Sequence, residues 1–277
     1  MRVPGGRTLA RGMLGKMRIG FQPPAERVRY PGGADSAACV SIDFDANSPE
    51  RLAYNGEGTH AIVDLSEKHG IPLTWAICGK TAEQDMKAYY RLLDSKAPRE
   101  IGIHTYSHID VSKSTEEEVR GEILRCAGVL DLKAIPKTFV FPWNREGHFD
   151  LLKRMGFATY RGKQRVIGAP SNEKGLWNIP PVYYVDHNSI GAGDLINRYI
   201  DVCVRYRSVF HLWLHPWSLI ERGDLAAMME TTMDPVFQHM AELRDDGLLS
   251  TSTMGEISAA MELENGGPDH PDLLLRT

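Results

Sequence analysis

Residues 37–46 read AACVSIDFDA, an apolar run that ends in two aspartates. A short apolar run of this kind predicts a β-strand over residues 37–44. Asp43 and Asp45 are two positions apart, so they point to the same side if the strand persists through them. The stretch therefore predicts a strand that carries two carboxylates at its carboxyl end.

Similar apolar runs alternate with amphipathic ones along the rest of the chain. The other predicted strands are residues 72–77, 100–104, 137–141, 158–162, 181–186, 209–215 and 248–253. The predicted helices are residues 59–70, 114–132, 148–157, 194–206 and 234–247. This alternation is typical of an α/β fold with a parallel sheet. A closed or nearly closed barrel is favoured over an open sheet, because no glycine-rich nucleotide loop follows the first strand.

Local signals mark several helix ends. Thr115 and Glu118 have the spacing of a capping box. Gly70, Gly156 and Gly247 each follow a helix-like run, where a C-terminal glycine cap belongs.

The barrel domain is expected over residues 37–262. Residues 1–36 are rich in glycine, proline and arginine and predict an irregular N-terminal extension, and residues 263–277 predict a C-terminal tail.

Composition excludes some classes of function. The formal net charge of −4 gives no basic surface for nucleic acid. The four cysteines are far apart and form no CxxC pair, which fits a reducing compartment. The sequence shows neither a signal peptide nor an apolar run of about 18 residues, so we expect a cytoplasmic protein without a transmembrane segment.

Polar residues gather where predicted strands end, and in parallel α/β folds that edge carries the chemistry. Besides SIDFDA, such ends are HTYSH (104–108), FPWNREGH (141–148) and LWLHPW (212–217). His104, His108 and one carboxylate of SIDFDA would make a ligand set for a zinc-class ion. The second carboxylate would act as general base, and His215 as general acid. Taken singly, each element also fits a structural role; four of them at strand ends favour one site.

In this order, SIDFDA, HTYSH, FPWNREG and LWLHPW resemble the motifs of the polysaccharide deacetylase (NodB-homology, carbohydrate esterase family four) family, over roughly residues 37–255. The resemblance implies a distorted (β/α) barrel with seven or eight strands and its site at the carboxyl-terminal mouth. It also implies metal-dependent removal of an acetyl group from an acetylated sugar. The Asp-Phe-Asp order resembles the branch that includes certain peptidoglycan-deacetylase-like proteins and cyclic amide hydrolases.

Carried over by position, the resemblance assigns Asp45, His104 and His108 to one divalent metal ion, most simply zinc. It assigns the base to Asp43 and the acid to His215. The family's third motif has an arginine before its proline, where this chain has Phe141, so we hypothesise that Arg145 reaches back to orient the base. The predicted pocket residues are Phe141, Pro142, Trp143, Asn144, Arg145, Trp213, Leu214 and Trp217.

The expected function is therefore N-deacetylation of a sugar. Without a secretion signal, the expected substrate is an intracellular glycan precursor, nucleotide- or lipid-linked. One alternative is a cyclic amide or imide hydrolase of the same fold. Another is a non-catalytic sugar-binding member, which the altered third motif keeps open. A homo-oligomer is expected from the Asp-Phe-Asp branch.

Overall fold

The structure is a computed structural model, and it describes residues 19–24, 27–172 and 174–264. The predicted N-terminal extension lies mostly outside these residues, as does the predicted tail at 263–277. Within the described part of the extension, residues 20–22 form a strand rather than irregular chain.

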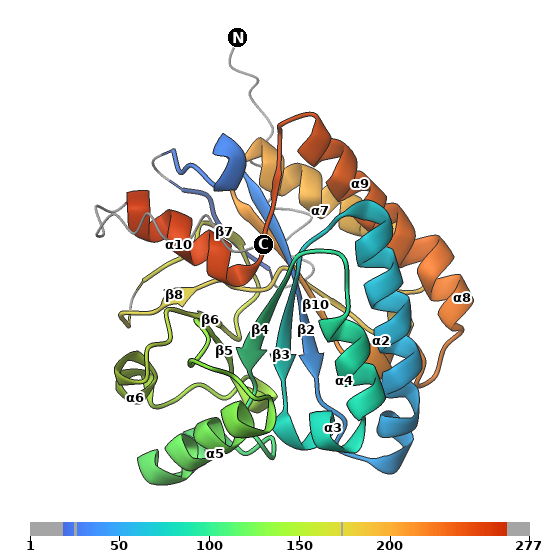
Figure 1. Cartoon of the computed structure of the whole chain (residues 1–277). Helices are drawn as coiled ribbons and strands as arrows, with labels where there is room; N and C mark the ends of the chain where they lie inside the picture. Colours follow the sequence, from blue (N-terminus) through green and yellow to red (C-terminus); the bar gives the residue numbers. More distant parts are fainter. Residues whose placement is uncertain (1–18, 25–26, 173, 265–277) are drawn as a thin grey trace.

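Strands that are parallel except for the β7–β10 pair form one curled sheet, with most helices on its outer face (Figure 1). The strands are β1 (Gly20–Gln22), β2 (Ala37–Phe44), β3 (Leu73–Ile77), β4 (Arg99–Ile103), β5 (Thr138–Val140), β6 (Thr159–Arg161), β7 (Val166–Gly168), β8 (Trp177–Asn178), β9 (Tyr183–Val185), β10 (Val209–Leu214) and β11 (Ser250–Thr251). The α-helices are α2 (Pro49–His69), α3 (Gly79–Gln84), α4 (Met86–Leu93), α5 (Glu116–Val129), α6 (Phe149–Arg154), α7 (Gly193–Arg205), α8 (Leu225–Met228), α9 (Asp234–Asp245) and α10 (Met254–Glu264). Short 3₁₀ or π turns are η1 (Pro31–Gly33), η2 (Val111–Lys113), η3 (Pro142–Asn144), η4 (His187–Ser189), η5 (Pro216–Leu219) and η6 (Met229–Met233).

The sheet has the order β1-β7-β10-β2-β3-β4-β5-β6-β8, with β9 also on β10 and β11 on β2. Among the described strands it stays open between β8 and β1, so the barrel is distorted rather than closed. This confirms the predicted (β/α) fold. Each of the eight predicted strands overlaps a strand of the structure.

The elements that sequence patterns missed are short or weakly amphipathic. Strands β1, β7 and β8 have two or three residues each and lie outside the predicted apolar runs, whereas β5, β6, β9 and β11 are equally short but lie within such runs. Helix α2 starts ten residues before the prediction, in a polar stretch that contains two glycines. Its first turn is set by the Ser48 side chain, which accepts a hydrogen bond from the Arg51 N–H.

The predicted helix caps are confirmed. Thr115 and Glu118 make a reciprocal capping box at the start of α5. Gly70, Gly156 and Gly247 have φ of 63°, 94° and 71°, in the left-handed region that favours glycine.

Strand alternation divides the side chains of β2 between two environments. Val40, Ile42 and Phe44 belong to the main apolar core, which the outer helices share. Ala37 and Cys39 point to the other face and meet Met254, Ile257 and Met261, because α10 closes the amino end of the barrel. All four cysteines are buried and free, as expected of small apolar side chains.

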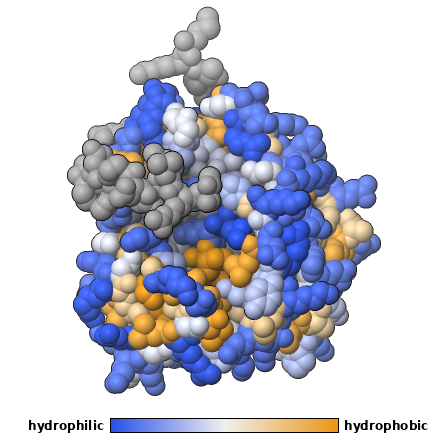
Figure 2. All heavy atoms as spheres, in the orientation of Figure 1, coloured by the Kyte–Doolittle hydropathy of each residue, from blue (hydrophilic) through white to orange (hydrophobic). Residues whose placement is uncertain are grey.

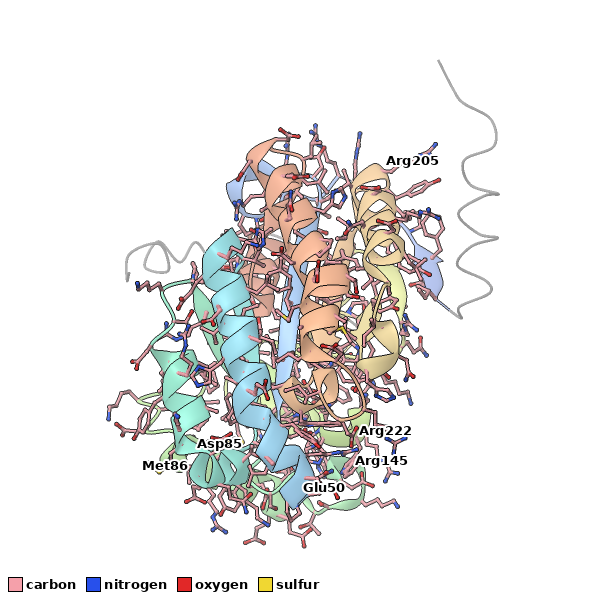
Figure 3. All side chains as sticks on the ribbon, turned by 90° about the vertical axis from the view of Figure 1, so that its right-hand side faces the viewer. Glu50, Asp85, Met86, Arg145, Arg205 and Arg222 are labelled. Carbon is pink, nitrogen blue, oxygen red and sulfur yellow. The ribbon has the colours of Figure 1, made fainter. Side chains whose placement is uncertain are left out.

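The surface is mostly hydrophilic on the face shown in Figure 2, with hydrophobic atoms gathered around β4 and β5 between the flanking helices. Among the described residues, no helix combines the length and apolar character needed to cross a bilayer. Figure 3 places Glu50, Arg145 and Arg222 at the end of the molecule to which β2, β3 and β4 run in Figure 1, and Arg205 at the opposite end. The candidate site lies at the former, carboxyl end of the strands.

Candidate metal and catalytic centre

Asp45, His104 and His108 come together at the carboxyl ends of β2 and β4. Their ligand atoms all lie within 4.8 Å of one another. His108 Nε2 is 2.9 Å and His104 Nε2 is 3.6 Å from Asp45 Oδ2. The parallel register explains the meeting, since β2 and β4 both pair with β3 and end at the same edge.

The loop between the two histidines has an unusual backbone. Thr105 and His108 have φ of 60° and 59°, which non-glycine residues rarely adopt. The N–H groups of Gly79 and Lys80 donate to the carbonyls of Thr105 and Tyr106 and hold the loop on α3. Strain of this kind persists where surrounding contacts impose it, and here it turns His108 toward Asp45.

The donor set fits a divalent ion. His104 Nδ1 lies 2.8 Å from the Val140 carbonyl oxygen, so Nδ1 carries the hydrogen and the Nε2 lone pair faces Asp45. That Nε2 is buried and has no hydrogen-bond partner. A backbone carbonyl behind the imidazole is the support that metal-binding histidines usually have. Two imidazoles and one carboxylate suit zinc-class ions, with a position left for water.

Electrostatics keep Asp45 ionised. Burial would raise its pKa, but His215, His104 and His108 outweigh burial and hold the pKa well below the ordinary value. The Trp217 indole also donates to Asp45 Oδ1 at 3.1 Å, and the Arg51 guanidinium lies 3.8 Å from the Trp217 ring centre.

Asp43 is bound by a buried arginine that sequence reasoning missed. Arg161, on β6, donates from Nη1 and Nη2 to the two Asp43 oxygens at 2.7 and 2.5 Å. Burial would raise the pKa of Asp43, but Arg161, His104 and His215 lower it below the ordinary value. The reach from β6 to β2 spans the barrel interior, where Ala76 and Gly102 are the small residues level with Asp43.

A second row of contacts fixes Arg161. Its Nη1 also donates to Ser41 Oγ at 3.1 Å, and its guanidinium lies 4.2 Å from the Trp213 ring centre. His211 lies 2.9 Å from the Ile179 carbonyl through Nδ1 and 2.8 Å from Ser41 Oγ through Nε2. Burial lowers the pKa of His211 to about 3, so the ring is neutral, donates to the carbonyl and accepts from Ser41. The Ser41 lone pairs are thereby left for Arg161.

The hypothesis that Arg145 orients Asp43 is wrong. Arg145 is exposed and pairs with Asp110 instead. The sequence does carry a signal for Arg161. In ATYRG (158–162) a charged residue stands inside a predicted strand that is buried, and the preceding residue, Tyr160, packs into the outer core.

His215 lies across from both carboxylates. Its Nε2 is 3.7 Å from Asp43 Oδ2 and 3.7 Å from Asp45 Oδ1, and Tyr184 Oη lies 3.1 Å from its Nδ1. Burial lowers the pKa of His215, and the two carboxylates offset this only in part. Burial also raises the pKa of Tyr184, so its hydroxyl is a donor and the His215 hydrogen sits on Nε2, toward the site.

Two predicted pocket residues are misplaced. Leu214 and Phe141 are fully buried in the main core, on the outer face of the sheet, because neighbours along a strand point to opposite sides. Trp213, by contrast, lies on the inner face beneath Arg161. Trp143 is 55% exposed, and its indole donates to the His108 carbonyl at 3.2 Å.

Two further members of the predicted set lie beside these residues. Asn144 Oδ1 is 3.5 Å from Arg161 Nη2, at the limit of a hydrogen bond. Pro142 is buried and opens the turn η3.

The sequence profile of the family described as polysaccharide deacetylase matches residues 32–146. The matched part of the chain, which includes Asp43, Asp45, His104 and His108, is thus similar to the polysaccharide deacetylase family. No curated protein sequence matches the chain significantly.

Solved structures share the fold across most of the chain. A crystal structure assigned as a polysaccharide deacetylase from Mycobacterium smegmatis is 17% identical with a TM-score of 0.71, covering 92% of this chain and 99% of that one. A second one, from Pseudomonas aeruginosa PAO1, is 15% identical with a TM-score of 0.67, covering 86% and 95%. Puue allantoinase is 15% identical with a TM-score of 0.61, covering 84% and 92%. At such identities the likeness shows the fold alone, and the Asp-Phe-Asp branch stays a prediction.

Proposed function

We propose that the protein is a metal-dependent hydrolase that removes the N-acetyl group from a sugar. The observation that carries the proposal is a buried Asp45–His104–His108 donor set with an unpartnered His104 Nε2. Beside it stands a second carboxylate that Arg161 keeps ionised. Similarity to the polysaccharide deacetylase family supports the same chemistry.

Asp43 is the proposed general base. A divalent ion held by Asp45, His104 and His108, which we propose to be zinc, would supply Lewis-acid activation of a water and of the amide carbonyl. Asp43 takes a proton from that water. Arg161 keeps the Asp43 carboxylate charged, and each oxygen that accepts from Arg161 has a second lone pair for the proton. The water oxygen then bonds to the carbonyl carbon.

His215 is the proposed proton donor to the departing amine. Its Nε2–H faces both carboxylates, and Tyr184 holds its other nitrogen. As the carbon–nitrogen bond breaks, the nitrogen gains a proton from His215, which recovers one from Asp43. Acetate and a free amino sugar leave, and the water's atoms are divided between them.

Aromatic side chains would shape the sugar and acetyl sites. Trp143, Trp213 and Trp217 lie around His108, Arg161 and Asp45 and offer apolar walls. We propose a nucleotide- or lipid-linked sugar precursor as the substrate, which a cytoplasmic enzyme would meet. A homo-oligomeric state also remains part of the proposal.

A second candidate is hydrolysis of a cyclic amide, for which the same metal ligands could serve. The Asp-Phe-Asp order and the fold shared with Puue allantoinase favour it. The argument for a non-catalytic member was the missing third-motif arginine, and Arg161 supplies that guanidinium from another strand.

The test is a panel of N-acetylated sugars, their nucleotide-linked forms and cyclic amides, scored for acetate release or ring opening. Metal-stripped protein is the control. We expect acetate from N-acetylated sugars only, restored when zinc is returned. Ring opening without acetate release would favour the second candidate, and no turnover with full metal loading would overturn both.

A further inference from the structure

A cavity of about 400 Å³ opens beside the metal-binding residues and is larger than an acetyl group requires. Asp45 and His108 form one wall of it. The opposite side is built from the loop after β2, the start of α2 and the helix α3. The cavity therefore extends the candidate site toward a further part of the substrate.

Lys80 is the cation of this cavity. Its side chain is exposed and has no hydrogen bond or ion pair within the described residues, while its backbone N–H is fixed on the Tyr106 carbonyl. Apart from Asp45, the lining residues include no carboxylate. Glu122 contacts the lining residue Ser107, and its two oxygens accept hydrogen bonds from the Ser107 N–H and hydroxyl.

Charges in the loaded site favour an anion. Asp43 and Arg161 neutralise each other in a bidentate pair. Asp45 with a divalent ion leaves one positive charge, and Lys80 adds a second at the same cavity. A cleft lined by one sign of charge concentrates ligands of the opposite sign.

Neutral donors in the wall suit the same ligand. Asn47 Oδ1 accepts from Arg51 Nη1, which turns its amide N–H₂ the other way. Ser48 Oγ accepts from the Arg51 N–H, so its hydroxyl hydrogen is free to donate. Gln84 adds an amide with no hydrogen-bond partner among the described residues. Phosphate and carboxylate oxygens are the acceptors that such donors and an ammonium bind.

We infer that this cavity, with Lys80 as counter-charge, binds an anionic group carried by the substrate, a phosphate or a carboxylate on the acetylated sugar. The inference rests on the proposed function for its orientation, with the acetamide at Asp45 and the anion at Lys80. It makes Lys80 a specificity-determining residue, because a neutral acetylated sugar leaves the ammonium unpaired.

The test compares three probes: N-acetylglucosamine, its 1-phosphate, and N-acetylmuramic acid, which carries a carboxylate. Dissociation constants are measured by calorimetry on zinc-loaded Asp43→Asn/Arg161→Met protein, which holds the probes uncleaved and removes both charges of the buried pair together, and kcat/KM is measured with Asp43 and Arg161 intact. One charge-assisted hydrogen bond at an exposed site predicts about tenfold tighter binding of an anionic probe. Lys80→Met should remove the difference, and Lys80→Arg should retain most of it.

The matched control is Lys87→Met, since Lys87 is also exposed but lies on α4 outside the cavity lining. It should change no probe's affinity. A preference for the phosphate alone identifies phosphate as the anion, and a preference for N-acetylmuramic acid alone identifies the carboxylate. Equal affinity for all three probes, or an equal loss for all three in Lys80→Met, overturns the inference.

The two proposals fail differently. If neutral and anionic probes release acetate with equal kcat/KM, the deacetylase proposal stands and the anion site is wrong. If no probe releases acetate but anionic probes bind in a Lys80-dependent way, the anion site stands and the deacetylase proposal is wrong.

Discussion

The two ends of the barrel interior both hold carboxylates, half-buried at the amino end and buried at the carboxyl end, and each end surrounds them with different partners. At the amino end, Glu100 accepts hydrogen bonds from the Thr138 hydroxyl, from Thr74 at 3.0 Å and from the Gly255 N–H at 3.0 Å. At the carboxyl end, Asp43 and Asp45 face a guanidinium and three imidazoles.

The electrostatic result is opposite at the two ends. Burial raises the pKa of Glu100 despite its hydrogen bonds from neutral groups. At the other end, the Arg161 guanidinium and the surrounding imidazoles outweigh burial and lower the pKa of the two aspartates. Hydrogen bonds from neutral groups therefore let Glu100 hold α10 in place, whereas the guanidinium and the imidazoles keep the aspartates charged and available for chemistry.

Removing a metal ligand should have the largest effect. His104→Ala takes away the imidazole whose Nε2 is buried without a partner. We expect bound zinc, measured by elemental analysis, to fall to a small fraction, and kcat/KM to fall by at least about a thousandfold. His239→Ala, which removes a surface imidazole paired with Asp201, is the control. Full zinc content in His104→Ala would show that the ion lies elsewhere.

Breaking the buried ion pair should come next. Arg161→Met leaves Asp43 charged and unpaired, which should cost about 3–5 kcal/mol of unfolding free energy. Loss of the oriented base should lower kcat about a hundredfold.

The double variant Asp43→Asn/Arg161→Met separates these effects. We expect it to regain much of the stability in urea titrations while staying inactive. If Arg161→Met were as stable as the wild type, the pair would not be the contact that holds Asp43.

The ligand set and the base pair differ in how far the sequence revealed them. Asp45, His104 and His108 follow strands β2 and β4, and their type and spacing carried the prediction. Arg161 lies four strands away from Asp43 along the sheet, and the sequence has no spacing that joins them. Only the curl of the sheet brings Arg161 and Asp43 together. Arg145 is the arginine nearest to Phe141 in the sequence, which is why the sequence pointed to it wrongly.

The fold, like the metal ligands, was predictable where a local pattern of residues in the sequence reports it. Strands of five or more residues, such as β2 and β10, show in an apolar run. Leu214 was predicted to line the pocket together with Trp213, but neighbours along a strand face opposite sides. Trp213 faces the inner side, and Leu214 packs in the main core. Strands β1, β7 and β8 lie outside such runs and form by pairing with distant segments, which no local pattern reports.

Weakening the support of the acid should have a moderate effect. Tyr184→Phe removes the donor to His215 Nδ1 and leaves the imidazole free to place its hydrogen on either nitrogen. We expect kcat to fall about tenfold, the equivalent of one hydrogen bond, with KM little changed. Tyr183→Phe is the matched control, because its ring packs in the main core. An equal loss in both variants would point to packing rather than to the acid.

At the amino end, a neutral replacement of Glu100 should change only stability. The native pKa of Glu100 lies above its unfolded value of about 4.5. The native state therefore holds the proton more firmly, and its advantage, complete below pH 4.5, is lost as pH rises through the native pKa. Glu100→Gln should become more stable relative to the wild type as pH rises, by about 1.4 kcal/mol for every tenfold difference in proton affinity between the native and unfolded states.

Urea titrations at several pH values test this, with exposed Glu117→Gln as the control. A difference between Glu100→Gln and the wild type that stays constant with pH would show that Glu100 is charged in both states.

The smallest effect is expected at Arg145, the arginine that the sequence suggested as the partner of Asp43. Arg145 is exposed and paired with Asp110 at the rim, so Arg145→Met should change unfolding free energy by less than about 1 kcal/mol. Because Arg161 already binds both oxygens of Asp43, kcat should change less than about twofold. A large fall in kcat at constant KM would mean that Arg145 leaves Asp110 during turnover and shares the base with Arg161. A rise in KM alone would instead place Arg145 against the substrate, where a rim cation acts on binding and not on the proton transfer.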